Sequence, residues 1–350
     1  MNFKLIINIC FLIIIFVSCQ KSEKYENAIT FSFNDFNTIM KLNANTIEFD
    51  ELIMKPLKFV LSDSLLIVQN IRTENMIYVY NINTKMKVGE YISWGSGPNE
   101  LQRIKDLQLV DSTLYITDTN LSRINLYDIN DFHLLTSITP KHKVQIDDRF
   151  YSAAYTNNGY VATTMNPDDK RLVFYNSNGE KEYTISDYPY YGTQLSDFEK
   201  MEGFLSSIVV SQKHKRIYLF GMNTDLIEIY DFNGELIKRL HGPEQFFPQI
   251  KTASLGDGYF KMAYNDDSRF AFSSPIVIDD EIYVSYSGNS QKENEEISQI
   301  KHILVFDKDC NPVRGYELSK SIVSFTIDPI KKHIYATSNI PDFHIVVFKL

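Results

Sequence analysis

Histidine and carboxylate side chains are the residues of this chain that could bind a metal or transfer a proton. The seven histidines are His133, His142, His214, His241, His302, His333 and His344. None is spaced as H-x-H, H-x-x-x-H or H-E-x-x-H, the local spacings typical of zinc sites. The pairs Asp168-Asp169 and Asp266-Asp267 lack the spacing of a calcium loop, and we interpret them as solvated surface charge. No metal or other cofactor is therefore predicted.

The glycine-rich segment Gly95–Glu100 could be taken for a phosphate-binding loop. Such a loop needs G-x-x-x-x-G-K-[ST], because backbone amides and a lysine meet the phosphates. Here Pro98 has no amide hydrogen and no lysine follows. A similar run, His241-Gly242-Pro243-Glu244, recurs later in the chain. We interpret both as turns.

Arginines and aromatic residues remain as candidates for ligand binding. Arg103, Arg123, Arg149 and Arg269 could meet an acidic ligand if the fold brings them together. Trp94 and the tyrosines around Pro189 could stack on a sugar, although Trp94 could instead fill a gap in the fold and the tyrosines could order their own loop. The candidate ligand-binding residues are Trp94, Arg103, Arg123, Tyr190 and Tyr191. The sequence has no G-x-S-x-G motif, and no catalytic residue is predicted.

The beginning of the chain is a targeting segment. Lys4 gives it a positive start, and Leu5–Val17 is almost wholly apolar. About thirteen apolar residues are too few for a membrane-spanning helix, which needs about 20, but they suit a secretory signal peptide. We predict a signal peptide over residues 1–18.

Cys19 directly follows this segment. Phe16-Val17-Ser18-Cys19 resembles the lipobox of bacterial lipoproteins, in which the cysteine is lipidated and becomes the mature N-terminus. Phe16 departs from the usual Leu, and an ordinary signal peptide cut nearby is the alternative. We predict lipidation of Cys19, attachment to the membrane through that lipid, and a tether over residues 19–28.

The remaining cysteines and the net charge exclude other classes. Cys10 leaves with the signal peptide, so Cys310 has no partner for an intramolecular disulfide. Cys310 lies in a turn-like sequence, and we interpret it as incidental rather than as a nucleophile. The formal net charge of −9 argues against nucleic acid as a partner.

From about residue 56 onward the chain is an array of repeats. Six segments each hold short runs of alternating apolar and polar residues, the pattern of half-buried strands. Four strands in about 50 residues are typical of a propeller blade. The sequence predicts an all-β fold over residues 29–350, a six-bladed β-propeller of four-stranded antiparallel blades. The predicted blades span residues 56–92, 104–139, 150–186, 205–241, 272–318 and 320–350.

The third strand of each repeat carries the clearest mark, an aromatic residue followed by Asp or Asn. The pairs are Tyr80-Asn81, Tyr127-Asp128, Tyr175-Asn176, Tyr230-Asp231 and Phe306-Asp307, and Phe348 ends the sixth repeat. Asn-Gly after two of these strands favours a tight hairpin turn into the fourth strand. In the second blade that fourth strand is predicted at Leu134–Ile138.

The sixth repeat ends after its third strand, at Leu350. A three-stranded blade would leave an unpaired edge. Residues 29–53 hold two spare strand-like runs, Ile29–Phe33 and Thr46–Glu51. We predict that one of them closes the ring as the outer strand of the sixth blade, and we favour Thr46–Glu51.

Several motifs resemble one known family. Trp94-Gly95-Ser96-Gly97-Pro98-Asn99-Glu100 resembles the G-x-G-P-x-E signature of TolB-like six-bladed propeller lipoproteins. The runs at 281–288, 302–307 and 311–318 resemble the C-terminal blades of that family. The resemblance covers Lys58 to Leu350 and implies the fold. It brings no assigned activity and no catalytic residues.

Strand alternation also predicts where a site lies. Turns between the first and second strands, and between the third and fourth, lie at one end of the ring. The other end, here named the long-loop end, carries the long segments 93–105, 140–150, 187–205, 241–274 and 288–301. Since loops on a rigid scaffold usually carry function, we expect the site at that end, at the mouth of the central channel.

These features lead to one main hypothesis about function and two rivals. We expect an exported protein, lipid-anchored at the cell envelope and in the outer membrane, with either side of that membrane left open. Its propeller would be a binding or scaffold module for an envelope protein or glycan. The alternative is an envelope enzyme, a polysaccharide lyase or hydrolase, with residues spread around the channel mouth. A third possibility is a sensor or assembly subunit, which an apolar patch at the long-loop end would favour.

Overall fold

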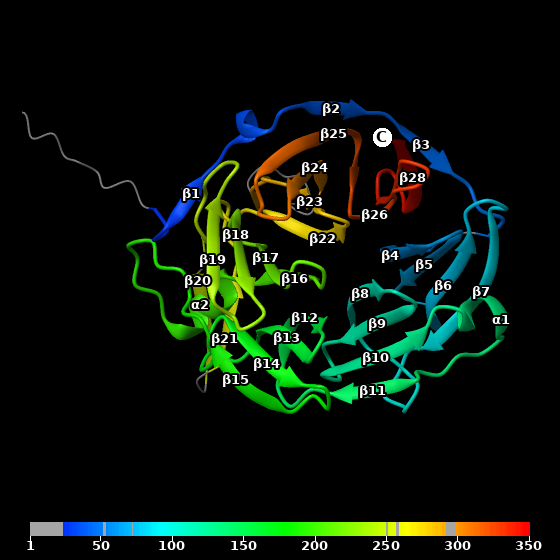
Figure 1. The fold of residues 1–350 in the computed structure, drawn as a ribbon, viewed down its shortest axis with the longest axis horizontal. Coiled ribbons are helices and arrows are strands. Elements are labelled where there is room, and N and C mark those ends of the chain that lie inside the picture. Colours follow the sequence, from blue (N-terminus) through cyan, green and yellow to red (C-terminus); the bar gives the residue numbers. More distant parts are fainter. Residues whose placement is uncertain (1–23, 52–53, 72, 250, 257–258, 292–298) are drawn as a thin grey trace, which may run out of the picture.

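In the computed structural model, six β-sheets form a ring around a central channel (Figure 1). The structure describes residues 24–350 except 52–53, 72, 250, 257–258 and 292–298, and it leaves out the side chains of 251–262. Cys19 and the predicted signal peptide lie outside the described residues. Within the described part of the chain, no helix is both long and apolar enough to cross a membrane.

The first three blades follow the chain in simple order, each with four antiparallel strands. Blade 1 consists of β4 (Pro56–Ser62), β5 (Leu65–Asn70), β6 (Asn75–Asn81) and β7 (Met86–Ser93). Blade 2 consists of β8 (Ile104–Val110), β9 (Thr113–Asp118), β10 (Arg123–Asp128) and β11 (His142–Gln145), with α1 (Asp131–Leu134) before β11. Blade 3 consists of β12 (Phe150–Thr156), β13 (Gly159–Thr164), β14 (Leu172–Asn176) and β15 (Lys181–Ile185).

The last three blades each gain a strand from the N-terminal segment. Blade 4 follows α2 (Asp197–Gly203) and consists of β16 (Ser206–Ser211), β17 (Arg216–Gly221), β18 (Leu226–Asp231), β19 (Leu236–His241) and β1 (Ala28–Thr30). Blade 5 consists of β22 (Phe272–Ile278), β23 (Glu281–Tyr286), β24 (Ile300–Asp307), β25 (Pro312–Ile322) and β2 (Ile39–Leu42). Blade 6 consists of β26 (Ser324–Asp328), β27 (His333–Ser338), β28 (His344–Lys349) and β3 (Ala44–Ile47).

The predicted six-bladed propeller and its closure by an N-terminal strand are confirmed. β3 pairs antiparallel with β28, with Thr46 opposite Val346 and Ile47 opposite Ile345. The closing strand thus overlaps the favoured run Thr46–Glu51 but begins and ends earlier in the chain. The sixth blade has no unpaired outer edge at β28 because β3 covers it.

The rest of the N-terminal segment forms a strap around the outside of the ring. β1 and β2 pair in parallel with β19 and β25, and the segment then continues into β3 (Figure 1). A 3-10 turn, η1 (Phe33–Asp35), lies between β1 and β2. The side chains of Phe31 and Phe36 are buried against blades 4 and 5. The strap therefore ties three consecutive blades together.

The outer strand of blade 2 was predicted in the wrong place. Residues 131–134 form α1, in which Phe132 is fully buried and Leu134 is 78% exposed. The outer strand is β11, so the blade extends to Gln145 rather than ending at residue 139. An outer strand needs only one inward side chain, here Val144, so its apolar pattern is weak.

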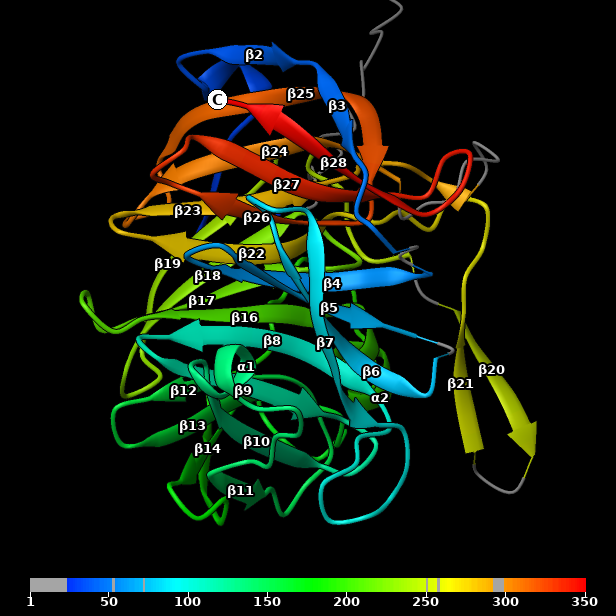
Figure 2. The same cartoon turned by 90° about the vertical axis from the view of Figure 1, so that its right-hand side faces the viewer.

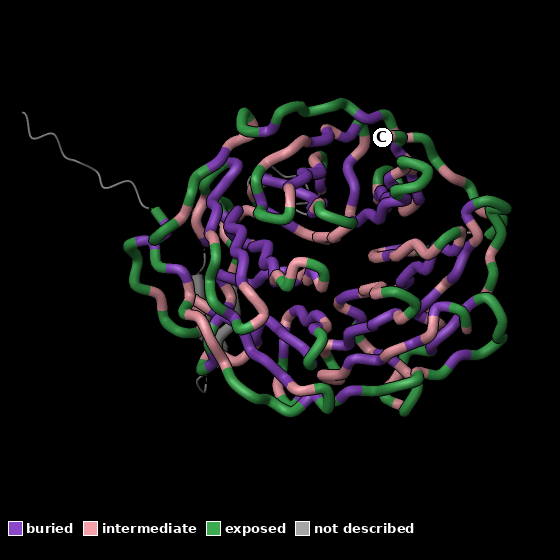
Figure 3. The backbone as a smooth tube through the Cα atoms, viewed as in Figure 1, coloured by how far each residue is buried: buried purple, intermediate pink, exposed green. Residues whose placement is uncertain are grey.

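The repeated aromatic–Asp/Asn pairs form the structural core of each blade. The aromatic side chains of the five pairs, and Phe348 of the sixth repeat, are buried between adjacent blades. The carboxylate or amide oxygen that follows accepts hydrogen bonds from the turn after the strand, as Asp231 does from the amides of Asn233 and Glu235. This side-chain-to-backbone turn explains why Asp or Asn occupies the position. Figure 3 shows the buried residues along the strands and the exposed ones at the turns and on the strap.

The long-loop end is the irregular end of the ring. It carries α2 and a hairpin of β20 (Lys251–Gly256) and β21 (Tyr259–Ala263) between blades 4 and 5. In Figure 2 this hairpin extends beyond the ring at the end where α2 lies. The short turns lie at the opposite end.

Candidate functional site

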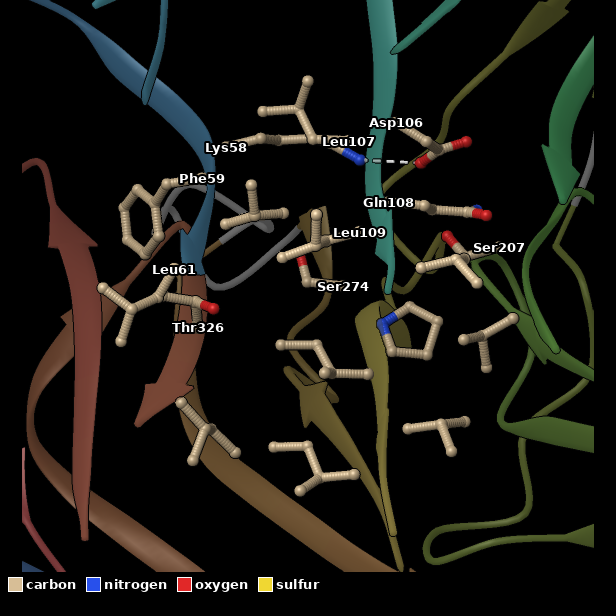
Figure 4. Close-up of a pocket in the computed structure, with 18 of the residues that line it drawn as sticks. Lys58, Phe59, Leu61, Asp106, Leu107, Gln108, Leu109, Ser207, Ser274 and Thr326 are labelled. Carbon is tan, nitrogen blue, oxygen red and sulfur yellow. Dashed lines mark hydrogen bonds and ion pairs between the residues drawn. The ribbon is translucent and has the colours of Figure 1, made fainter. Parts of the chain in front are cut away.

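The first strand of every blade faces the central channel, and the channel holds two cavities. One cavity, of about 450 Å³, opens at the long-loop end and is named here the mouth cavity. The second, of about 340 Å³, lies further along the channel and is lined more by Val, Leu and Ile; Figure 4 shows its lining. The side chains of Lys58, Ser207, Ser274 and Ser324 line both. The mouth cavity lies at the end of the ring where the long loops predicted a site.

The mouth cavity is lined by cationic side chains. Lys58 is the third residue of β4 in blade 1, Arg103 directly precedes β8 of blade 2, and Lys105 is the second residue of β8. No Asp or Glu is among the described residues that line this cavity. The mouth cavity is therefore locally positive in a chain whose net charge is −9. The low-dielectric protein walls of the cavity strengthen the electric field of these cations.

Asp106 neutralises only one of these cations. Its Oδ1 atom lies 3.0 Å from Lys58 Nζ, and its Oδ2 atom accepts a hydrogen bond of 2.9 Å from Ser152 Oγ (Figure 4 shows the ion pair). Burial opposes ionisation of Asp106, but Lys58 and Lys105 outweigh it and hold the pKa of this carboxyl below its ordinary value. Asp106 therefore remains an anion at neutral pH.

Lys105 has no carboxylate within ion-pair distance among the described residues. Its Nζ atom lies 3.7 Å from the centre of the Tyr151 ring, a cation–π contact. Burial lowers the pKa of Lys105, and nearby Asp106 opposes that effect. The side chain of Arg103 is exposed and also makes no ion pair within the described part of the chain. Two cations at the mouth are thus available to an anionic ligand.

Neutral hydrogen-bonding groups surround the cations. The hydroxyl groups of Ser207, Ser273, Ser274 and Ser324 line the mouth cavity. Ser324 Oγ and Gln69 Oε1 are buried atoms with no hydrogen-bond partner in the described part of the chain. Buried polar groups usually have partners, so these two atoms are candidates for contact with a ligand or an ordered water. The cavity can therefore offer both charge and neutral hydrogen bonds.

The titratable groups among the described residues of the mouth cavity are Lys58, Arg103, Lys105 and Tyr151. Burial raises the pKa of the Tyr151 phenol to about 12, the opposite of what a general base needs. No histidine is among the described residues lining the mouth cavity. The described residues also contain no cluster of three or more His, Cys, Asp or Glu side chains suited to a metal ion.

Of the five candidate binding residues, only Arg103 lines the mouth cavity. Trp94 is 64% exposed on the long-loop end, so the interpretation that it fills a gap in the fold is wrong. Of the other arginines, Arg149 is exposed but lies outside the cavity lining, and Arg269 bonds Glu244 and the carbonyl of Gly288. The arginines therefore do not converge.

Arg123 belongs to the glycine-rich loop instead. It donates a hydrogen bond to the carbonyl of Glu100, whose carboxylate accepts a 2.7 Å bond from the amide of Gly97. The same carboxylate lies where a side chain at Gly95 would be, which accounts for glycine there. The loop closes on its own Glu100 rather than on a phosphate, in agreement with its interpretation as a turn.

The tyrosines of the 187–205 segment separate into two environments. Tyr191 is 6% exposed and stacks on Phe247 at a centroid distance of 4.7 Å. Tyr190 is 54% exposed. Only Tyr190 of the two is therefore accessible to a partner.

A second charged cluster, within and beside blade 4, is internally satisfied. Buried Glu228 accepts hydrogen bonds from Arg171 Nε at 2.8 Å and from Arg239 Nη2 at 2.9 Å. Burial opposes ionisation of Glu228, but the two guanidinium groups hold its pKa below the ordinary value. Each charge has its partner, so this cluster stabilises the fold and offers no open site.

Lys58 and Lys105 were not predicted as site residues. Each resembles an ordinary surface lysine in its local sequence, and only ring closure places them beside the same cavity. One signal was present: both stand at the long-loop beginning of an inner strand. In a propeller that position faces the channel mouth.

Comparison with known proteins agrees with this architecture. Residues 33–329 match the family described as TolB-like 6-blade propeller-like. A candidate exported protein of Bacteroides fragilis NCTC 9343 has a similar structure, with a TM-score of 0.54 and 12% identity, covering 92% of this chain and 98% of that one. A member of the duf4221 family from Bacteroides vulgatus ATCC 8482 gives a TM-score of 0.53 and 10% identity, covering 89% and 96%. No protein with a curated description matches the chain. The family match spans most of the chain, which therefore belongs to the TolB-like six-bladed propeller family.

Proposed function

We propose that this protein is an exported lipoprotein of the cell envelope whose propeller binds a ligand carrying an oxyanion group at the mouth cavity. Cys19 carries the lipid, after a signal peptide over residues 1–18. The similar Bacteroides fragilis protein, described as a candidate for export, supports this location.

One observation carries the binding proposal: Arg103 and Lys105 are cations for which no described residue supplies a carboxylate partner. Removing the Lys105 ammonium group from water costs free energy unless other groups replace its hydration. The cation–π contact with the Tyr151 ring replaces this hydration only in part. An oxyanion beside Lys105 and Arg103 would supply the remaining stabilisation of these charges through charge-assisted hydrogen bonds. Lys58 is less available, because it is already paired with Asp106.

The neutral part of the cavity favours a ligand that also has hydroxyl groups. Ser207, Ser273, Ser274 and Ser324 can donate to or accept from sugar hydroxyls. Carboxylates of acidic sugars and phosphates of phosphorylated sugars share the required chemistry. The proposed ligand class is therefore an acidic or phosphorylated saccharide of the envelope.

Thermal unfolding of the protein with small probes tests this proposal. The probes are glucuronate, glucose 6-phosphate and glucose, each with sodium chloride added to equal ionic strength. A bound ligand at about ten times its dissociation constant stabilises by about 1.4 kcal/mol, which raises the melting temperature by about 2 °C. We expect this rise with an acidic probe and none with glucose.

Two lysine variants locate the effect. Lys105→Gln removes a cation of the mouth and should abolish the rise. Lys143→Gln removes an exposed cation on β11, far from the cavity lining, and should leave the rise unchanged. Stabilisation by glucuronate alone identifies a carboxylate ligand, and stabilisation by glucose 6-phosphate alone identifies a phosphate. No stabilisation by either acidic probe, or equal stabilisation of both variants, would overturn the proposed site.

A further inference from the structure

The chain enters the propeller through one buried side chain, Tyr25. Its exposed fraction is only 2%, and its hydroxyl lies 2.9 Å from Thr224 Oγ1. Four rings surround it, at centroid distances of 4.7 Å for His241, 4.9 Å for Phe247, 5.3 Å for Tyr191 and 5.9 Å for Phe204. These four rings and Thr224 thus enclose the Tyr25 side chain at blade 4. The pocket that they form is here named the socket, and Tyr25, which fills it, the plug.

The backbone beside the plug is also fixed. The amide of Glu26 donates to the carbonyl of Tyr190 at 3.0 Å, and Arg239 donates to the carbonyl of Glu26 at 2.8 Å. Arg239 is itself held by buried Glu228. The chain then continues into β1, paired with β19. The backbone is therefore held in place by hydrogen bonds from Glu26 into β1.

The socket lies at the long-loop end of the ring. Thr224 belongs to the connection between β17 and β18, and Tyr191 and Phe247 belong to connections between blades. Both kinds of connection lie at the long-loop end. The tether therefore leaves the propeller at the same end as the mouth cavity.

The tether is shorter than the predicted 19–28, because Tyr25 is buried in the fold and β1 begins at Ala28. Five residues separate Cys19 from Tyr25. Even a fully extended chain of this length reaches only about 20 Å. A lipid on Cys19 would hold the Tyr25 socket within that distance of the bilayer.

We propose that the propeller faces its own membrane with the long-loop end, the edge of blade 4 being nearest the lipid. This inference rests on the proposed lipidation of Cys19. Tyr190, exposed beside the plug, is the type of side chain enriched at membrane–water interfaces. A net charge of −9 gives no overall attraction to an anionic bilayer, so the tether sets the distance. A ligand would then reach the mouth cavity from the space between propeller and membrane.

Energy transfer from the two ends of the propeller to the bilayer tests the orientation. The full chain is produced with Tyr190→Cys or with Ile330→Cys, isolated from membranes and placed in vesicles containing an acceptor-labelled lipid. Ile330 is 88% exposed in the short turn between β26 and β27, at the opposite end of the ring. Lipid blocks Cys19 and Cys310 is fully buried, so a maleimide donor labels only the new cysteine. We expect at least twofold higher transfer from position 190 than from position 330.

A longer tether provides the matched control. A Gly-Ser insertion of about 20 residues after Lys21 gives a flexible linker of about 25 Å mean extension beyond the native reach. It should reduce transfer from position 190 towards that from position 330, without changing the thermal stability. Equal transfer from both ends in a lipidated protein overturns the orientation and leaves the proposed anchor and binding site standing. Mass spectrometry that finds no lipid on Cys19 overturns the anchor and the orientation together.

Discussion

Lys58 Nζ and Asp106 Oδ1 lie 3.0 Å apart across the boundary between blades 1 and 2. This ion pair joins two inner strands at the level where the mouth cavity meets the second cavity. It also leaves Arg103 and Lys105 at the mouth without a carboxylate partner among the residues that the structure describes. The pair therefore stabilises the ring. Because Asp106 is paired with Lys58, Arg103 and Lys105 are the charged groups that can bind an anionic ligand.

The first prediction concerns removal of the carboxylate. Asp106→Asn should lower the free energy of unfolding by about 2 kcal/mol, because Lys58 then stays partly buried without its partner. It should also strengthen oxyanion binding several-fold, because Lys58 becomes available. Urea unfolding and titration with glucuronate measure the two effects. Asp187→Asn is the control, since its pair with Lys170 is exposed and should contribute less than about 0.5 kcal/mol. Weaker binding by Asp106→Asn would argue that the ligand site does not include Lys58.

The second prediction concerns pH. Burial lowers the pKa of Lys105 below its ordinary 10.5, so the folded protein releases this proton at a lower pH than the unfolded chain does. Between the two pKa values the unfolded chain binds more protons, and stability must rise with pH. As the pH rises towards 10.5, the wild type should gain stability relative to Lys105→Gln, while its oxyanion affinity falls. Parallel stability curves for the two proteins would show that Lys105 is solvated as an ordinary lysine.

The third prediction concerns the strap. Phe31 is 4% exposed and packs edge-on against Phe306 at a centroid distance of 5.7 Å. Phe31→Ala should lower the free energy of unfolding by about 3 kcal/mol. Ile29→Ala, two residues earlier and 56% exposed, should change it by less than about 0.5 kcal/mol. Chemical unfolding followed by circular dichroism measures both, and equal effects would mean that this part of the strap contributes only its backbone hydrogen bonds.

The fourth prediction concerns the thiols. Cys310 is fully buried, and burial raises its pKa. Protein isolated from membranes should therefore show no thiol reactive towards dithiodipyridine when folded, and one after unfolding in guanidinium. A thiol that reacts in the folded protein would contradict this result, and peptide mapping would assign it to Cys19 or Cys310.

The parts of the fold predicted from sequence are those with a strong local cause. Pairs such as Tyr230-Asp231 combine a buried ring with a turn-forming carboxylate, so the third strand of a blade can be recognised from its sequence. The closing strand was predictable because the sixth repeat lacked one. By contrast, β1 and β2 pair through their backbones, and their side chains are largely exposed, so no apolar alternation marks these short strands.

The sequence predicted the end of the ring at which to expect a site, but not the lysines that line the mouth cavity. The long loops predicted a site at the mouth of the channel, and Arg103, one of the candidates taken from the sequence, lines the mouth cavity there. Lys105 was missed because its environment comes from Tyr151, on the neighbouring blade and 46 positions later in the chain. The sequence left the environment of Trp94 open, because burial statistics for tryptophan do not decide a single residue on a loop.

Calorimetric titration of glucuronate and glucose 6-phosphate into two double variants tests the central claim most directly. Arg103→Gln with Lys105→Gln removes both unpaired cations of the mouth. Lys143→Gln with Arg149→Gln makes the same change in net charge at exposed positions outside the cavity lining. We predict that the first double variant loses at least tenfold in affinity for the acidic ligand, about 1.4 kcal/mol, while the second binds as the wild type does. Equal affinities for both double variants would contradict oxyanion binding at the channel mouth.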